Sequence, residues 1–162
     1  MHRNKVDRID RQLLEILQER GCTKRRELAR LIGMTIPSIS DRLHKLENTG
    51  VIRGYRAILD PEKVQLEVTA FILLYSASSE HHQQIEESAR NHAEILECHA
   101  ITGEAAYLLK VRTHNTQTVQ ALVKELQTWP GVRNTQTSIA LSTAKETTVL
   151  PLHYLPEATE SV

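Results

Sequence analysis

The first part of this chain takes its fold from the stretch Glu27-Leu28-Ala29-Arg30-Leu31-Ile32-Gly33-Met34-Thr35-Ile36-Pro37-Ser38-Ile39-Ser40-Asp41-Arg42-Leu43-His44-Lys45-Leu46. Ala29 is small enough for a second helix to cross close to the first. Gly33, four positions later, can take the positive φ that a tight turn needs. Ile39 follows after six more residues and gives the second helix a buried side chain. This spacing predicts a helix-turn-helix, and the alternative is a plain αα-corner.

The neighbouring segments extend the motif into a three-helix module. A first helix is expected to begin at Asp7, which can cap it, and to end at Gly21. Thr23 and Thr35 are the expected N-caps of the second and third helices. The β-rich run 51–59 then predicts a strand, which makes the module winged-helix-like.

The third helix presents polar and basic side chains on the face opposite its apolar stripe. Such side chains can contact base edges and phosphates. The alternative for the basic group before the second helix is ordinary solvated surface charge. The candidate DNA-binding residues are Lys24, Arg25, Arg26, Thr35, Ser38, Ser40, Arg42, His44 and Lys45.

Charge is divided unevenly along the chain. Residues 1–60 carry 13 Lys and Arg against 8 Asp and Glu, and residues 61–162 carry 7 against 12, which gives net charges of +5 and −5. The basic part suits a polyanion such as DNA, whereas nucleic acid would repel the acidic part. The sequence therefore predicts two modules with different roles.

Composition excludes several other classes of protein. The 162 residues are 40% hydrophobic and 25% charged, as in ordinary globular proteins. The charged N-terminus has no apolar signal core, so we expect a cytoplasmic protein without a membrane segment. Cys22 and Cys98 form no metal or disulfide framework, and the adjacent Cys98 and His99 would point to opposite faces of a strand. We expect no metal, no cofactor and no catalytic residues.

The second part reads as βαββαβ, the order of a ferredoxin-like sandwich with both helices on one face of the sheet. Because the other face needs cover, we expect a dimer, which would also serve a helix-turn-helix that reads two half-sites. The expected strands are 68–76, 95–102, 106–112 and 132–143. The expected helices run from a cap at Ser78 or Ser79 to about Asn91 and from Thr118 to Gln127.

The order of these parts resembles the Lrp/AsnC family of prokaryotic transcription regulators (leucine-responsive, or feast/famine, regulators) over nearly all of residues 6–152. The first module carries the resemblance in 6–11, 27–29, 33–35, 42–47, 50–55 and 59–61. In the second module it rests on Gly103, 107–111, 130–132, Thr135 and Thr137.

The resemblance implies an α+β protein with four parts along the chain. These are a helix-turn-helix domain at 1–60, a hinge at 61–67, a ferredoxin-like effector and oligomerisation domain at 68–150 and a C-terminal arm or tail at 151–162. It implies double-stranded DNA and further copies of the chain as partners, in dimers, tetramers or octamers. It also implies a small effector, usually an amino acid, bound between dimers.

The effector-binding residues implied by the resemblance are Gly103, Glu104, Ala105, Ala106, Tyr107, Thr135 and Thr137. Many amino-acid-binding members carry an aspartate just before the tyrosine, where this chain has Ala106. An aspartate is a natural partner for an α-ammonium group. The absence of this aspartate weakens the case for a simple amino acid as effector.

The leading hypothesis is a sequence-specific DNA-binding transcription regulator and not an enzyme. A nucleoid-type protein that wraps DNA with little sequence preference is one alternative. The other is an enzyme resembling the sirohaem decarboxylases, which share this fold. That alternative is weakened because 55–61 contains no histidine.

Overall fold

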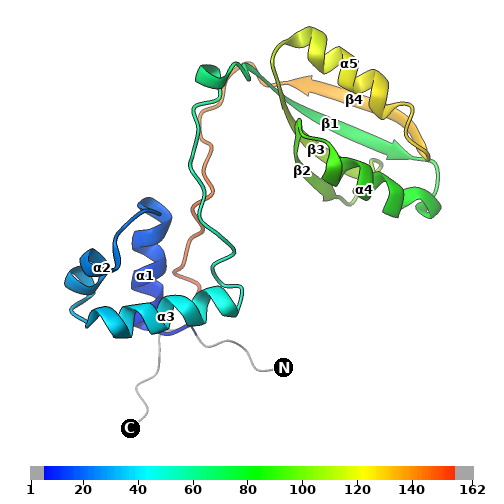
Figure 1. Ribbon diagram of the computed structural model, residues 1–162. Coiled ribbons are helices and arrows are strands. Elements are labelled where there is room, and N and C mark those ends of the chain that lie inside the picture. Colours follow the sequence, from blue (N-terminus) through cyan, green and yellow to red (C-terminus); the bar gives the residue numbers. More distant parts are fainter. Residues whose placement is uncertain (1–5, 156–162) are drawn as a thin grey trace. The chain divides into compact units, whose positions relative to one another are not determined.

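The computed structural model describes residues 6–155, and the chain divides into two compact units. The helical unit comprises Met1–Ile58 together with Glu146–Val162, and the sheet unit comprises Leu59–Lys145. The first unit is helical, and the second contains a sheet with helices packed on it (Figure 1).

The helical unit is built from α1 (Arg8–Glu19), α2 (Arg25–Ile32) and α3 (Ile36–Asn48). Its core consists of the buried side chains Leu13, Leu28, Ala29, Ile39 and Leu43. Gly33 ends α2 with a φ of 77°, a left-handed conformation that favours glycine. The predicted helix-turn-helix is therefore confirmed.

Two of the three predicted helix caps are confirmed. The Asp7 carboxylate accepts from the Asp10 backbone N–H at 2.8 Å, and the Thr35 hydroxyl accepts from the Ser38 N–H at 3.3 Å. The prediction for Thr23 is wrong, because its hydroxyl donates to the Arg20 carbonyl at 2.6 Å. Lys24 occupies the N-cap position of α2 without a side-chain hydrogen bond. Thr23 thus satisfies a carbonyl after α1 instead of the N–H groups of α2.

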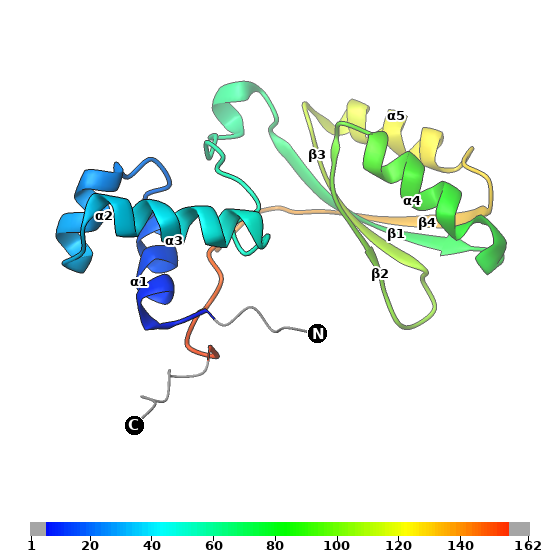
Figure 2. The same ribbon diagram turned by 60° about the horizontal axis from the view of Figure 1, so that its bottom comes forward.

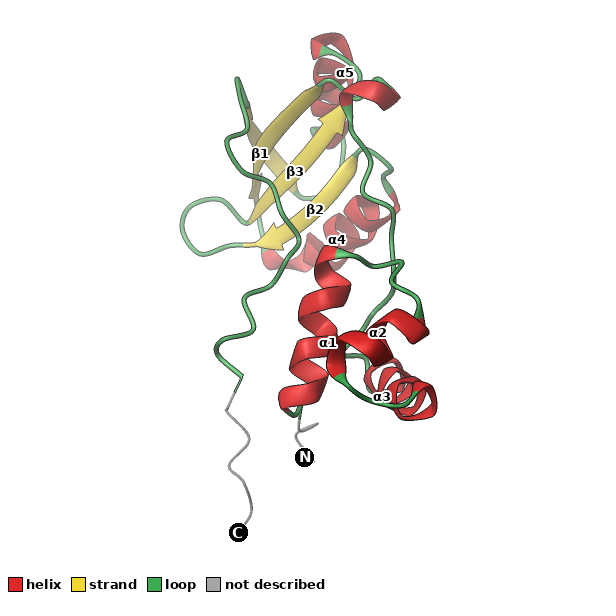
Figure 3. Cartoon of the chain, turned by 90° about the vertical axis from the view of Figure 1, so that its left-hand side faces the viewer, coloured by secondary structure: helices red, strands yellow, loops and turns green. Residues whose placement is uncertain are grey.

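The strand predicted for 51–59 does not form. Figure 3 shows no strand between α3 and β1 (Val68–Ser76). The segment is extended and largely exposed, with Ile58 88% exposed. A strand needs a neighbour to accept and donate its backbone hydrogen bonds, and the described part of the chain supplies none here. The β-rich composition of this segment therefore predicted a strand wrongly, because no neighbouring strand among the described residues pairs with it.

The sheet unit follows the predicted βαββαβ order. After β1 come α4 (His82–Asn91), β2 (Ile95–Ala100), β3 (Tyr107–Thr113), α5 (Thr116–Leu126) and β4 (Val132–Ile139). The strands are antiparallel in the order β2-β3-β1-β4. Figure 2 shows α4 and α5 on the same side of the sheet. This is the predicted ferredoxin-like α+β arrangement.

One face of the sheet packs against both helices. The buried side chains alternate along β1 and β3, as expected for strands with a single covered face. The core residues are Ala70, Ile72, Leu74, Ile85, Ala89, Tyr107, Leu109, Val111, Val119, Leu122 and Leu126.

Several predicted boundaries in the sheet unit differ from the structure. β3 begins and ends one residue later than predicted, and α5 begins at Thr116 and ends at Leu126. A short 3-10 helix, Ser79–His81, precedes α4, so the helix begins at His82. β2 ends at Ala100 and its pairing with β3 shifts between Ile95 and Glu97, which breaks the predicted alternation. β4 ends at Ile139, where its pairing with β1 stops.

The segment predicted as a hinge, 61–67, contains a 3-10 turn at Glu62–Val64 followed by Gln65. Gln65 has a φ of 61°, which makes it the single non-glycine residue with positive φ in the described chain. Its carbonyl lies 2.8 Å from the His114 imidazole Nδ1. Gln65 therefore has a backbone conformation that favours glycine.

A C-terminal segment returns to the helical unit. The Leu150 N–H donates to the Gln18 side-chain carbonyl at 2.7 Å, and the Gln18 amide donates to the Leu150 carbonyl at 3.2 Å. These two bonds attach the segment to α1. The end of the predicted tail, 156–162, lies outside the described residues.

Candidate nucleic-acid interface

Helix α3 is held by one face and exposes the other. Ile39, Leu43 and Leu46 are buried against the rest of the helical unit. The opposite stripe is exposed and consists of Pro37, Asp41, His44 and Asn48. Because these four recur at intervals of three and four, they lie along a single line of the helix surface. This exposed line is therefore available to contact an elongated ligand along most of the length of α3.

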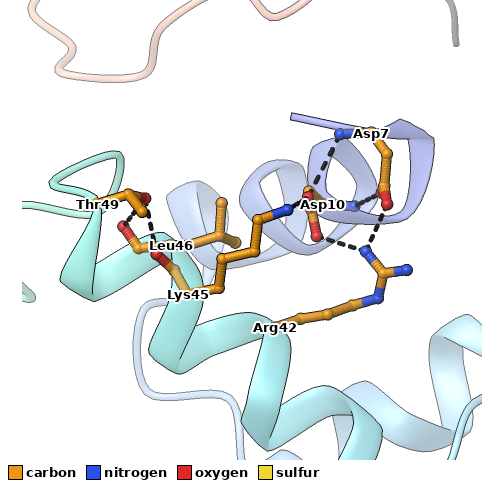
Figure 4. A network of polar contacts seen from close by, with 6 residues as sticks. All are labelled: Asp7, Asp10, Arg42, Lys45, Leu46 and Thr49. Atoms are coloured by element: carbon orange, nitrogen blue, oxygen red, sulfur yellow. Dashed lines mark hydrogen bonds and ion pairs between the residues drawn. The ribbon is translucent and has the colours of Figure 1, made fainter. Parts of the chain in front are cut away.

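A cluster of charged side chains connects α1 to α3 (Figure 4). One guanidinium nitrogen of Arg42 donates to Asp7 at 2.6 Å and to Asp10 at 2.7 Å. The Lys45 ammonium lies 3.5 Å from the other oxygen of Asp10. Asp10 is fully buried, and the Arg42 side chain is 25% exposed. Arg42 and Lys45 of α3 are therefore both paired with the buried Asp10 carboxylate of α1.

The same contacts shift the pKa values of Asp7 and Arg42. Burial by itself would raise the pKa of Asp7, but hydrogen bonds from the Asp10 N–H and from Arg42 outweigh it and leave the pKa lowered. The hydrogen bond to Asp7 is the main cause that raises the pKa of Arg42, opposed by partial burial. Both groups are thus held in their charged forms.

Arg42, a predicted DNA contact, directs its guanidinium toward α1, where one nitrogen is paired with Asp7 and Asp10. These ion pairs join α3 to α1 and so give Arg42 a part in positioning α3. Its contact with DNA remains a prediction.

The other candidates on α3 lie in different environments. The hydroxyl groups of Thr35 and Ser38 form a hydrogen bond of 2.8 Å at the start of the helix. Ser40 is half-buried on one flank of the exposed stripe, whereas His44 is exposed within it. Lys45 is exposed on the other flank, with its weak contact to Asp10. Their contacts with DNA remain predictions.

Three consecutive cations stand at the start of α2. Lys24, Arg25 and Arg26 are all exposed, and none forms an ion pair within the described part of the chain. The backbone N–H groups of the first helical turn lie at the same place and carry the positive end of the helix dipole. This end of α2 is suited to a phosphate group.

Two polar residues of the exposed stripe, Asp41 and Asn48, are absent from the predicted DNA contacts. Asp41 lies on the polar face that the sequence predicts for this helix, and Asn48 follows His44 at helical spacing. Glu47, on the flank, accepts a hydrogen bond from the Tyr55 hydroxyl at 3.0 Å. Burial, and after it the bond to Glu47, raises the pKa of Tyr55 to about 12. Glu47 is thus engaged within the chain.

Among the predicted effector residues, Tyr107 is buried beneath α4. Its hydroxyl donates to the Glu86 carboxylate at 3.0 Å and lies 3.5 Å from the His82 carbonyl. Burial first, and then the bond to Glu86, raises the pKa of Tyr107 to about 12. Within one chain, this hydroxyl already has its partners.

The remaining effector candidates lie in two places. Four of them lie in the loop between β2 and β3, where Gly103 and Glu104 are exposed, Ala105 is buried and Ala106 is half-buried. Gly103 has a φ of 118°. Thr135 and Thr137 are on β4, which is separated from β3 by β1. Thr135 accepts from the Gln127 amide at 3.1 Å, and Thr137 lines a shallow groove of about 520 Å³ beside α5. Tyr107 on β3 and Thr135 on β4 are both paired with Leu74 of β1, which lies between them.

The chain joins a helix-turn-helix, in which α3 exposes one face, to a ferredoxin-like unit. This combination is that of a DNA-binding regulator with a separate sensing module. Residues 6–53 match a winged helix-turn-helix DNA-binding model, and residues 69–150 match the Lrp/AsnC ligand binding domain. The chain belongs to the Lrp/AsnC family and is a transcriptional regulator of that type.

Named relatives cover most of the chain. It is 34% identical over 147 residues to the HTH-type transcriptional regulator FL11 of Pyrococcus abyssi, covering 91% of this chain and 97% of that protein. It is 32% identical over 144 residues to the leucine-responsive regulatory protein of Escherichia coli, with coverages of 87% and 88%. These relatives are regulators, as their names state.

Solved structures of the same family are equally similar. A transcriptional regulator of Neisseria meningitidis, in complex with L-methionine, has a TM-score of 0.88 and 34% identity, covering 93% of this chain and 99% of that one. An AsnC family regulator of Agrobacterium tumefaciens has a TM-score of 0.87 and 33% identity, with coverages of 93% and 99%.

No helix among the described residues is both long and apolar enough to cross a membrane. Within the same residues, no group of three or more His, Cys, Asp and Glu side chains is arranged to hold a metal ion.

Proposed function

We propose that this regulator binds specific duplex DNA sequences with the exposed stripe of α3 in the major groove. The single observation that carries the proposal is the orientation of α3, with its apolar face buried and Pro37, Asp41, His44 and Asn48 exposed. An α-helix fits the major groove, where base edges are distinguishable. Lys24, Arg25 and Arg26 then contact flanking phosphates, which position the helix without reading sequence.

We expect the triple variant Lys24→Ala/Arg25→Ala/Arg26→Ala to bind duplex DNA with a salt slope reduced by about 2 to 3, because each phosphate contact contributes roughly 0.9 to that slope. The measurement is the affinity for a fixed duplex over a range of salt concentrations. The double variant Arg90→Ala/Lys124→Ala removes exposed cations from the sheet unit and is expected to keep the wild-type slope. An unchanged slope in the triple variant would exclude these residues as phosphate contacts.

The nucleoid-type alternative predicts a different affinity ratio. A regulator of specific sites binds its preferred duplex about 10³-fold or more tightly than random duplex at the same salt concentration. A DNA-wrapping protein would show a ratio close to one. Duplexes selected from a randomised library supply the preferred sequence for this comparison.

The second proposed partner is another copy of the chain. The face of the sheet away from the helices carries Phe71, Leu73 and Tyr75 on β1 and Leu108 on β3, with Phe71 39% exposed in the single chain. Burying these side chains against a second sheet removes apolar surface from water. Pairing also gives two copies of α3 for two half-sites.

We propose that the protein acts in the cytoplasm, by binding DNA, and that it catalyses no reaction.

The third proposed partner is a small effector in the sheet unit. The support is the matched ligand-binding domain and a relative solved with L-methionine. Because the Tyr107 hydroxyl is engaged within the chain and β1 lies between β3 and β4, we propose that residues of a second copy complete the site. Small polar molecules with an α-amino acid group are the first class to test.

We expect a free amino acid that binds the folded chain to raise the melting temperature, since a ligand at 100 times its Kd adds about 2.7 kcal/mol of stability. Ala106→Asp restores the carboxylate that the family resemblance implies, and is expected to strengthen the response to L-amino acids. Ala106→Asn is the control of similar size without charge. A screen in which neither the wild type nor Ala106→Asp responds would count against an amino-acid effector.

A further inference from the structure

Asp41 is an unneutralised carboxylate at the centre of the proposed DNA-binding stripe. It is exposed on α3 and makes no hydrogen bond or ion pair with any residue that the structure describes. An acidic side chain facing a polyanion is repelled by it. An aspartate at this position of the exposed stripe is therefore unfavourable for DNA binding unless a particular group of the DNA offsets the repulsion.

The cations that could neutralise Asp41 are used elsewhere. Lys45 stands four residues further along α3, at the spacing of a common helical ion pair, but its ammonium lies 3.5 Å from Asp10. Arg42, the next residue, is bound to Asp7 and Asp10. The charged cluster that holds α3 in place thus leaves the Asp41 carboxylate without an ion-pair partner among the described residues.

The major groove offers few groups that could accept such a carboxylate. The cytosine amino group donates a hydrogen bond to Asp or Glu. The adenine amino group lies beside N7, an acceptor that repels a carboxylate, and guanine presents two acceptors. A carboxylate that loses its hydration without a donor is strongly unfavourable. Asp41 can therefore be tolerated in the groove opposite cytosine and is penalised elsewhere.

We propose that Asp41 is a specificity-determining residue that selects a C·G pair at one position of the bound site by accepting from the cytosine amino group. This inference rests on the proposed placement of α3 in the major groove. It assigns Asp41 a selective role, in which unfavourable contacts with other base pairs matter as much as the favourable one.

The test is selection from a randomised duplex library with the full-length protein, comparing wild type, Asp41→Asn and Asp41→Ala. The wild type is expected to enrich cytosine at one position by about 10-fold or more. Asp41→Asn should enrich adenine at that same position, because an amide can pair with adenine N6 and N7. Asp41→Ala should show no preference there. Both variants should bind a fixed random duplex several-fold more tightly, because a repulsive charge is gone.

Glu19→Gln removes an exposed charge on α1 and is the control for general charge effects. It should keep the wild-type base preferences. Selection of the same bases by wild type and Asp41→Asn would overturn the role of Asp41 and leave the placement of α3 intact. If the wild type enriched no sequence at all, the proposed sequence-specific binding would fail, and the role of Asp41 with it.

Discussion

Replacing Arg42 by methionine is expected to lower the free energy of unfolding of the helical unit by about 2 to 3 kcal/mol at neutral pH. The variant leaves Asp10 buried beside Asp7, with Lys45 at 3.5 Å as the remaining cation. Breaking a buried ion pair by removing one partner is costly because the other charge stays desolvated. This loss lies below the roughly 3 to 5 kcal/mol that breaking a fully buried pair costs, since Arg42 is 25% exposed.

Two signals separate this effect from general destabilisation. Trp129, the only tryptophan, is in the sheet unit, so its fluorescence should report an unchanged transition during urea unfolding. Helical circular dichroism should show an earlier transition. Arg11→Met breaks an exposed ion pair with Glu15 in the same unit and should cost less than about 0.5 kcal/mol. Equal effects of the two variants would contradict the assigned role of Arg42.

The difference between wild type and Arg42→Met should depend on pH. The pKa of Asp7 is lowered in the folded protein, so its contribution is present above its unfolded pKa, roughly 3.9. That contribution disappears as the pH falls through the lower, folded pKa. The difference in stability should therefore be largest near neutral pH and shrink below about pH 4.

DNA binding gives a further distinction. If Arg42 positions α3 without touching phosphate, Arg42→Met should weaken binding without changing the salt slope. A slope reduced by about 1 would instead indicate a direct phosphate contact. Affinities measured below the unfolding transition, with the fraction folded known, separate these two outcomes.

The second large effect is expected for Gly131→Ala, which should destabilise the sheet unit by about 2 to 4 kcal/mol. A β-carbon on Gly131 would lie 2.4 Å from the His81 Cβ and 2.8 Å from two atoms of its ring. The φ of 81° adds a conformational cost for alanine. Trp129 fluorescence, two residues away, should report the loss directly.

The matched control is Gly33→Ala, whose φ of 77° is similar but whose added β-carbon would meet no atom within 4 Å. It should cost the helical unit only the conformational penalty, about 1 to 2 kcal/mol. Adding His81→Gly to Gly131→Ala removes the clashing atoms and should restore part of the stability. A loss no greater than that of Gly33→Ala would show that the His81 contact yields without cost.

Much of the fold could be predicted because local patterns coincide with what the tertiary structure needs. Ala29, Gly33 and Ile39 predict the helix-turn-helix through size, backbone freedom and apolar spacing, which are properties of the residues themselves. The βαββαβ order follows in the same way from alternation and helical periodicity. The strand at 51–59 was predicted wrongly because a strand exists only with a partner, and composition does not provide one.

Sequence alone determined the class of this protein: a basic helix-turn-helix module followed by an acidic ferredoxin-like module, because periodicity, caps and charge are local. Only the tertiary structure decided which cations face outward. Arg42 and Asp10 are 32 residues apart, and nothing in the sequence shows that they form an ion pair. Because each buried charge needs a partner brought to it by packing, it depends on how α1 and α3 meet that Arg42 is paired within the helical unit while Asp41 is exposed.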